Sequence, residues 1–457
     1  MASHPHHNQI KMVRIEEFVS LQRPLTSACC AISLLLVPKE ESNLINSTHT
    51  VRVKLADQQA DPNSPLYSVK TFEELQLSPE LLKGLYAMKF SKPSKIQERA
   101  LPLLLSNPPR NMIGQSQSGT GKTAAFVLTM LSRLNLGLKL PQAICLAPSR
   151  ELARQIMEVV HQMAQFTDIT TSLVVKDSVK RKQPVQGQIV VGTPGSVQDM
   201  IKRRLLPVQG VRILVLDEAD NMLDQDGLGD QSVKIKMLIK QNPQIILFSA
   251  TFPDHVRRFA TRFAPDANEI SLKREELSVD AIKQFFMDCD NEEHKYEVLC
   301  NLYDLLTVSQ SIIFCKRRDT ADEIARRMTS QGHAVVSLHG KMEPEERDRV
   351  MDDFRRGEFK VLITTNVLAR GIDILQVSLV INYDMPLDQQ GQPDYEAYLH
   401  RIGRTGRFGR QGVSINFVHD KKSCEQNMAI EQYFQRPIQR VPTDDWEAVE
   451  KQLRKVL

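Results

Sequence analysis

The strongest constraint on the fold is a glycine-rich run that ends in Lys-Thr, namely Ser116-Gln117-Ser118-Gly119-Thr120-Gly121-Lys122-Thr123. Glycine has no Cβ, so successive backbone N–H groups can curl around a phosphate. Lys122 then reaches the β/γ-phosphates, and the Thr123 hydroxyl can ligate Mg²⁺. The helix-prone residues 123–128 predict a helix whose N-terminus favours the anion. The run therefore predicts a nucleotide triphosphate site at a strand–loop–helix turn.

A second motif, Asp217-Glu218-Ala219-Asp220, follows the apolar residues 211–216, which predict a buried strand. Asp217 at the strand's end would hold the metal, mostly through water. Glu218 beside it is placed to orient and deprotonate the attacking water. A phosphate loop alone can arise by chance, but the two motifs in this order predict that the nucleotide is hydrolysed.

Composition adds few constraints on function. The 457 residues can form two or three domains, and a net charge of +4 is too small to establish a nucleic-acid partner. Seven scattered cysteines without a CxxC pair favour a reducing compartment and no zinc site. The apolar residues 27–37 are too few to span a bilayer, so no membrane insertion is expected. An export signal, a docking or packing segment and an alternative start remain open for this stretch.

Apolar runs alternate with helical stretches in two similar series, which favours βαβ units around parallel sheets. The expected strands are 142–147, 188–192, 214–216 and 244–248 in the first series and 311–315, 334–338, 360–364 and 378–382 in the second. The expected parts are an atypical segment 1–40, an extension 41–66, a first domain 67–272, a linker 273–279 and a second domain 280–457.

The second series has no phosphate loop, but it contains His400-Arg401-Ile402-Gly403-Arg404-Thr405-Gly406-Arg407. These arginines could form a solvated face or a phosphate clamp, and the interleaved glycines favour the clamp. Arginine stabilises charge on a transferring phosphoryl group by factors of about 10³–10⁵ in rate. We therefore expect the nucleotide to lie between the domains, with the second domain donating arginines.

Together these motifs resemble the DEAD-box RNA helicases, over about residues 67–457. The resemblance implies two tandem RecA-like domains, each a parallel sheet flanked by helices. It implies that Lys122, Glu218, Arg404 and Arg407 are catalytic and that Thr123 and Asp217 hold Mg²⁺. The implied ATP-binding residues are Phe72, Phe90, Gln97, Ser118, Gly119, Thr120, Gly121, Lys122, Thr123, Asp217, Gly371, Asp373, Arg404 and Arg407. By the same resemblance, Gln97 would hydrogen-bond the adenine edge, Phe90 would stack near it, and Phe72 would support from upstream.

The resemblance also covers the family's RNA motifs, at residues 148–152, 193–195 and 364–373. The implied RNA-binding residues are Arg150, Thr193, Gly195, Arg347, Thr365 and Arg370, and Ser249 and Thr251 would couple hydrolysis to unwinding. Recognition of phosphates and 2′-hydroxyls would favour RNA over DNA with little sequence readout.

Residues 53–57, 61–68, 107–112, 389–393 and 440–446 resemble the branch of the family that exports messenger RNA. This resemblance implies a monomer of the cytoplasm and nucleus that acts on messenger ribonucleoprotein at the cytoplasmic face of the nuclear pore. Its implied partners are single-stranded RNA, a β-propeller nucleoporin, and an activator that uses inositol hexakisphosphate. An ATP-gated RNA clamp, whose hydrolysis only resets binding, remains an alternative to unwinding, and a DNA helicase is a third option.

Overall fold

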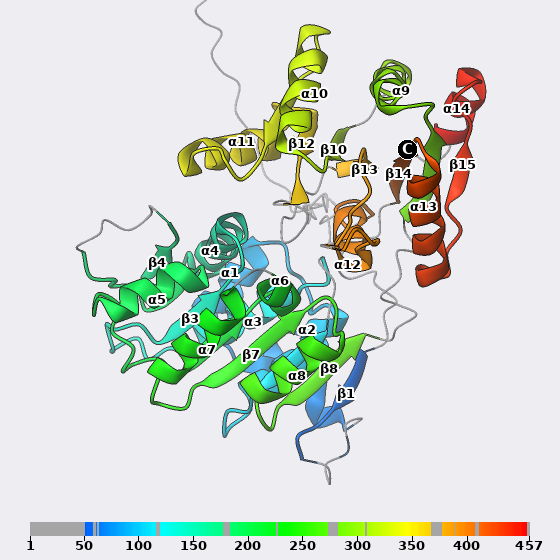
Figure 1. The fold of residues 1–457 in the computed structure, drawn as a ribbon. Coiled ribbons are helices and arrows are strands. Elements are labelled where there is room, and N and C mark those ends of the chain that lie inside the picture. Colours follow the sequence, from blue (N-terminus) through cyan, green and yellow to red (C-terminus); the bar gives the residue numbers. More distant parts are fainter. Residues whose placement is uncertain are drawn as a thin grey trace, which may run out of the picture. The chain divides into compact units, whose positions relative to one another are not determined.

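The structure is a computed structural model, shown in Figure 1. It describes residues 51–57, 61, 64–115, 119–176, 183–224, 227–272, 282–306, 309–366, 377–388, 390–406 and 411–454. All of them belong to the compact unit Glu41–Leu457. The predictions for residues 1–40 and for the linker 273–279 fall outside the described residues.

The first domain is built on an eight-stranded sheet. Its strands are β1 (Val51–Lys54), β2 (Met112–Gln115), β3 (Ala143–Leu146), β4 (Thr171–Val174), β5 (Ile189–Gly192), β6 (Ile213–Leu216), β7 (Gln244–Ser249) and β8 (Asn268–Leu272). The order across the sheet is β1-β8-β2-β7-β6-β3-β5-β4, and only β1 is antiparallel, pairing with β8. Every residue of β3, β5, β6 and β7 is buried, as in a sheet covered on both faces.

Helices cover both faces of this sheet because successive side chains of a strand point to opposite sides. Cys145 packs with the helices of one face, whereas Ile144 and Leu146 pack with those of the other. The first set consists of α1 (Pro79–Ala87), α2 (Lys95–Leu105), α3 (Lys122–Ser132) and α4 (Arg150–Ala164), with the short helices η2 (Pro65–Tyr67) and η3 (Glu73–Leu75). The second set consists of α5 (Pro194–Lys202), α6 (Ala219–Asp224), α7 (Leu228–Leu238) and α8 (Asp254–Phe263).

The second domain is built on a seven-stranded, all-parallel sheet. Its strands are β9 (Ile282–Asp288), β10 (Gln310–Phe314), β11 (Val335–Leu338), β12 (Val361–Thr364), β13 (Val377–Asn382), β14 (Gly412–Val418) and β15 (Gln439–Val441), in the order β11-β12-β10-β13-β14-β9-β15. Its helices are α9 (Glu292–Leu305), α10 (Arg318–Ser330), α11 (Pro344–Arg356), α12 (Tyr395–Ile402), α13 (Lys421–Phe434) and α14 (Trp446–Leu453). Figure 1 shows these elements in colours that run from green at α9 through yellow at α11 to red at α14.

The two sheets share one topology. If β1 is set aside and the seven remaining strands of each domain are numbered along the chain, both sheets have the order 7-1-6-5-2-4-3. The prediction of two similar, mainly parallel α/β domains is therefore confirmed. Each of the eight strands that we expected is present, and its observed ends lie within one residue of the expected ends. Among the helices that the structure describes, none is long and apolar enough to cross a membrane.

Candidate active site

The phosphate loop connects β2 to α3, as its sequence predicts. Lys122 is the first residue of α3, and Gly121 before it has φ +93°. A Cβ at Gly121 would lie 2.7 Å from Gln97 Nε2 and 2.8 Å from Ser94 Oγ. Both the left-handed backbone and the lack of space therefore require glycine at this position.

The start of α2 braces this loop from behind. The Ser94 hydroxyl donates to the carbonyl of Thr120 (2.9 Å), and Gln97 Nε2 donates to the carbonyl of Gly121 (3.0 Å). Gln97 Oε1 also accepts from the Ser94 N–H (2.9 Å), which completes a capping box. The structure thus assigns Gln97 a bracing role that the sequence analysis missed, although the Ser-x-x-Gln spacing is a recognisable signal. Its contact with adenine stays a prediction.

Phe90 is predicted to stack near the adenine and Phe72 to support from upstream, and the two side chains differ in their exposure. Phe72 is fully buried in the core of the first domain. Phe90 is partly buried against the same core and follows Lys89, whose φ is +62°. Phe72 can therefore act only from within the core, by supporting the residues around it.

A buried ion pair joins the phosphate loop to the end of β6. Lys122 Nζ lies 3.4 Å from Asp217 Oδ1, and the two side chains are 7% and 1% exposed. Burial lowers the pKa of Lys122, but attraction by Asp217, Glu218 and Asp220 outweighs it and raises that pKa. Burial also raises the pKa of Asp217 against the opposing pull of Lys122. Three carboxylates near one ammonium leave an excess of negative charge, which suits a divalent cation. Thr123, the other residue predicted to hold the metal, directly follows Lys122 in the chain.

Glu218 has an uncommon backbone conformation, with φ +53° for a residue that is not glycine. Its side chain is buried and accepts a hydrogen bond from Asn221 Nδ2 (3.3 Å). The Glu218 N–H donates to Asp217 Oδ1 (3.0 Å). Such backbone strain concentrates at functional sites, so the geometry fits a carboxylate held for a reaction.

Asp220 ties the ends of β6 and β7 together. Its N–H donates to Ser249 Oγ (3.1 Å), and its Oδ2 accepts from the N–H (3.0 Å) and hydroxyl (2.9 Å) of Thr251. His400 Nε2, from α12 of the second domain, lies 3.4 Å from the same oxygen. The predicted coupling residues Ser249 and Thr251 are therefore brought to the Asp217–Asp220 motif, through contacts that the sequence did not reveal.

The described second-domain candidates lie at the ends of β12 and α12. Thr365 directly follows β12. Arg404 follows α12, is buried, and donates from Nε to the carbonyl of His400 (2.9 Å). Five other predicted site residues are outside the described residues, namely Ser118, Arg370, Gly371, Asp373 and Arg407.

The RNA candidates of α4 and α11 are engaged in ion pairs between the two domains. Arg150 donates to both oxygens of Asp348, at 3.0 Å from Nε and 2.6 Å from Nη2. Arg347 Nη2 lies 2.5 Å from Glu151 Oε1, and Arg154 Nη1 lies 3.0 Å from Asp348 Oδ1. The structure therefore brings Arg150 and Arg347 together, and adds Arg154 and Asp348, which the sequence analysis missed.

The remaining RNA candidates lie at the start of α5. Thr193 precedes this helix as its N-cap, and Gly195 is its second residue. The Thr193 hydroxyl donates to Ser196 Oγ (3.2 Å) and does not accept a capping hydrogen bond from a backbone N–H of the helix. A helix N-terminus of this kind presents backbone N–H groups suited to a phosphate.

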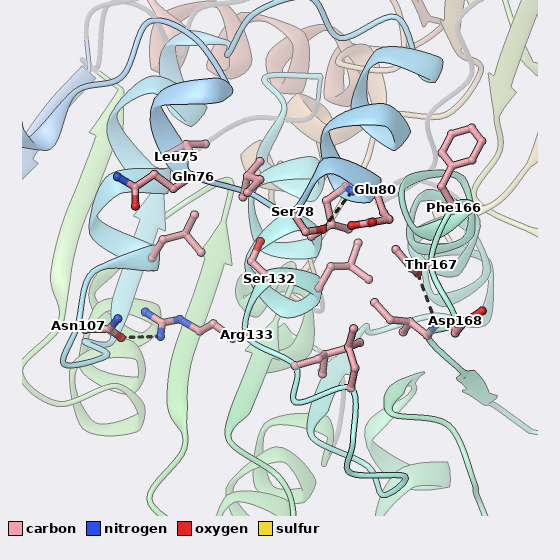
Figure 2. Close-up of a pocket in the computed structure, with 17 residues that line it drawn as sticks. Leu75, Gln76, Ser78, Glu80, Asn107, Ser132, Arg133, Phe166, Thr167 and Asp168 are labelled. Carbon is pink, nitrogen blue, oxygen red and sulfur yellow. Dashed lines mark hydrogen bonds between the residues drawn. The ribbon is translucent and has the colours of Figure 1, made fainter.

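A separate cavity of about 610 Å³ lies on the first domain, between α1 and the C-terminal ends of α2 and α3 (Figure 2). Leucines and Phe166 share its walls with Glu80, Asp168 and Arg133. Arg133 donates to the backbone carbonyls of Leu104 and Ser106 and to Asn107. None of the predicted site residues lines this cavity, so it is separate from the predicted nucleotide site.

Two family models match the chain. They are DEAD/DEAH box helicase over residues 94–259 and helicase conserved C-terminal domain over residues 294–409. The ATP-dependent RNA helicase dbp5 of Schizosaccharomyces pombe is 68% identical over 418 residues, which are 92% of this chain and 83% of that protein.

Solved structures agree with this likeness. Saccharomyces cerevisiae Dbp5 bound to RNA and ADP BeF3 has a TM-score of 0.82 and 59% identity, over 85% of this chain and all of that one. A variant of the same protein bound to Nup159, Gle1, IP6 and ADP has a TM-score of 0.62 and 57% identity, over 83% of this chain and 99% of that one. With this identity along nine-tenths of its length, the chain belongs to the DEAD-box ATP-dependent RNA helicases of the Dbp5 type.

Proposed function

We propose that the enzyme couples ATP hydrolysis to local unwinding of RNA duplexes and to remodelling of messenger ribonucleoprotein during mRNA export. The observation that carries this proposal is the arrangement at the carboxyl ends of β6 and β7. There a buried Lys122–Asp217 pair lies beside the strained Glu218, and Asp220 ties both to Thr251. In this arrangement Lys122 can bind a phosphoryl group, Glu218 can activate the attacking water, and Asp220 can transmit a change at the site to Thr251.

The proposed roles follow from the chemistry of each residue. Lys122 and the backbone of Gly119–Thr123 hold the phosphates, and Glu218 takes the proton of the attacking water. Arg404 and Arg407 stabilise the charge that develops on the transferred phosphoryl group. Mg²⁺, held by Thr123 and by Asp217 partly through water, would neutralise charge on the phosphate oxygens.

The RNA contacts are proposed for the arginines and helix ends already described. Arg150, Arg347 and Arg370 would bind backbone phosphates, together with Thr193, Gly195 and Thr365. Arg150 and Arg347 are now paired with carboxylates, so RNA phosphates would replace Asp348 and Glu151 as their partners. Such binding depends on phosphate charge and should weaken steeply with salt.

The partners are proposed from the relatives. Two solved structures of a Dbp5 variant contain Gle1 with IP6, and one of these two also contains Nup159. We propose that this chain takes the equivalent activator with inositol hexakisphosphate and the equivalent β-propeller nucleoporin. It would work as a monomer at the cytoplasmic face of the nuclear pore, shared between cytoplasm and nucleus.

Steady-state ATPase activity tests the proposal, measured without nucleic acid, with single-stranded RNA and with DNA of the same sequence. Stimulation by RNA alone supports it, and equal stimulation by DNA contradicts it. Release of a labelled RNA duplex then separates unwinding from clamping. Release under ATP but not under a non-hydrolysable analogue supports unwinding, whereas retention in both cases favours the ATP-gated clamp.

A further inference from the structure

Arg401 occupies a position that the proposed mechanism does not use. It lies on α12, three residues before Arg404, and its side chain is among the largest that are fully buried. One edge of its guanidinium donates twice to a single oxygen, because Nε (3.0 Å) and Nη2 (2.5 Å) both contact Asn366 Oδ1. Nη1 donates to Asn382 Oδ1 (3.0 Å) and to the carbonyl of Asp384 (2.7 Å).

The partners of this guanidinium are neutral oxygens. The carboxylate of Asp384 is directed elsewhere, to Lys295 Nζ (2.8 Å) and to the N–H of Lys316 (2.7 Å). Burial lowers the pKa of Arg401 to about 10, and its charge lies 5.0 Å from the centre of the Phe314 ring. A buried charge of this kind contributes little to stability compared with an apolar side chain, so its value lies in the geometry that it imposes.

The acceptor on the core side is fixed by a chain of amides. Asn382 Nδ2 donates to Asn416 Oδ1 (2.9 Å), and Asn416 Nδ2 donates to Asn427 Oδ1 (2.9 Å) on α13. With its nitrogen so engaged, Asn382 must present its oxygen to Arg401. One side of the guanidinium is therefore anchored in the core of the second domain.

The other side reaches the segment proposed to bind RNA. Asn366 is exposed and directly follows Thr365 at the end of β12. The same α12 ends beside Arg404, which is proposed to contact the transferred phosphoryl group. We propose that Arg401 is a positioning residue that joins the RNA-contacting end of β12 to the arginine-bearing end of α12. This inference rests on the roles proposed for Thr365 and Arg404.

The predicted consequence is that RNA binding and arginine placement fail together. Arg401→Lys keeps a positive charge but loses the planar fork that holds Asn366, Asn382 and Asp384 at once. We expect the turnover number with saturating RNA to fall about 10- to 100-fold, because small displacements of catalytic groups have effects of that size. The RNA concentration for half-maximal ATPase should rise about 3- to 10-fold, as expected for one lost hydrogen-bonded contact. ATP affinity without RNA should stay unchanged.

A second variant avoids the risk that a core substitution only unfolds the domain. Asn366 is exposed, so Asn366→Ala removes the acceptor without opening the core, and it should show the same two changes in weaker form. Asn366→Asp keeps the acceptor and should retain activity. The double variant of Arg401→Lys and Asn366→Ala should be no worse than Arg401→Lys alone, because both remove one contact.

The control is Lys295→Met, which removes the other partner of Asp384 from the side of α9. It should lower the thermal stability of the protein and leave the RNA concentration for half-maximal activity unchanged. If Arg401→Lys behaves like this control, with normal turnover and RNA dependence, Arg401 is a core residue only and the inference is wrong. If Thr365→Ala and Arg404→Ala are both fully active, the failure lies in the proposed function instead.

Discussion

With β1 set aside, the two domains have the same strand order, but the turns after β2 and β9 carry side chains of opposite charge. In the first domain this turn carries the glycines and Lys122, and the first turn of α3 has no acidic residue. In the second domain the turn between β9 and α9 contains Asp290, and α9 begins with Glu292 and Glu293. Carboxylates at that position repel a phosphate, whereas backbone N–H groups and a lysine attract it. The comparison supports our proposal that the turn, and not the fold, determines which domain binds the nucleotide.

A Lys–Asp pair with a buried lysine is nevertheless present in both domains, at equivalent places in the topology. Lys122 lies in the first turn of α3, after β2, and Lys295 lies in the first turn of α9, after β9. Asp217 follows β6 and Asp384 follows β13, which are the fifth strands of their sheets when β1 is set aside. In the second domain the pair is tighter, at 2.8 Å, and the ammonium also contacts Glu292 and the ring of Tyr383. We therefore expect the pair to hold the structure of the second domain, and the pair of the first domain to be available to a ligand.

The largest expected effect belongs to the first domain alone. Glu218→Gln should lower turnover by about 10²–10⁴-fold, because it removes the group proposed to accept the proton of the attacking water. Binding of ATP and RNA should persist, since the amide keeps the shape of the side chain. Steady-state ATPase together with ATP and RNA titrations measures both properties. Normal turnover in this variant would exclude Glu218 as the base.

A substitution of Lys295, the counterpart of Lys122 in the second domain, should change stability and not catalysis. Lys295→Met leaves the partly buried carboxylate of Asp384 without its lysine partner but with the N–H of Lys316, which should cost about 1–3 kcal/mol in the free energy of unfolding. Thermal and denaturant unfolding would detect this loss. ATP affinity measured at a temperature where the protein is folded should not change. A marked loss of ATP affinity would mean that the second pair also serves the nucleotide.

A smaller effect should come from the residues that brace the phosphate loop. Ser94→Ala removes the hydrogen bond to the Thr120 carbonyl, and we expect ATP affinity to fall about 2- to 10-fold. The second domain offers a matched control in Asn291→Ala, which removes the N-cap of α9. That control should lower stability slightly and leave ATP affinity unchanged. Equal ATP affinities in Ser94→Ala and the wild type would show that the brace has no functional role.

Much of this architecture follows from local sequence. The runs 142–147 and 244–248 correspond to β3 and β7 because buried parallel strands are short, apolar and bounded by polar residues. The helix after the phosphate loop was equally clear, because its start is fixed by Gly121 and Lys122. These features depend on neighbours in the chain.

Features that depend on distant residues could not be predicted in this way. The antiparallel pairing of β1 joins Val51 to Leu272, and nothing in either segment specifies its partner. Gln97 was assigned to adenine by resemblance alone, whereas its contact with Gly121 requires two segments to meet. The ion pair of Arg150 with Asp348 likewise forms only once both domains have folded.

The central claim is that the first domain binds the nucleotide while the second supplies arginines for its hydrolysis. The most direct test measures ATP affinity and RNA-stimulated turnover side by side for Lys122→Ala and Arg404→Ala. We predict that Lys122→Ala loses both, and that Arg404→Ala keeps most of its ATP affinity while its turnover falls by about 10³-fold or more. If Arg404→Ala turns over ATP normally, or loses affinity as fully as Lys122→Ala, this division between the domains is wrong.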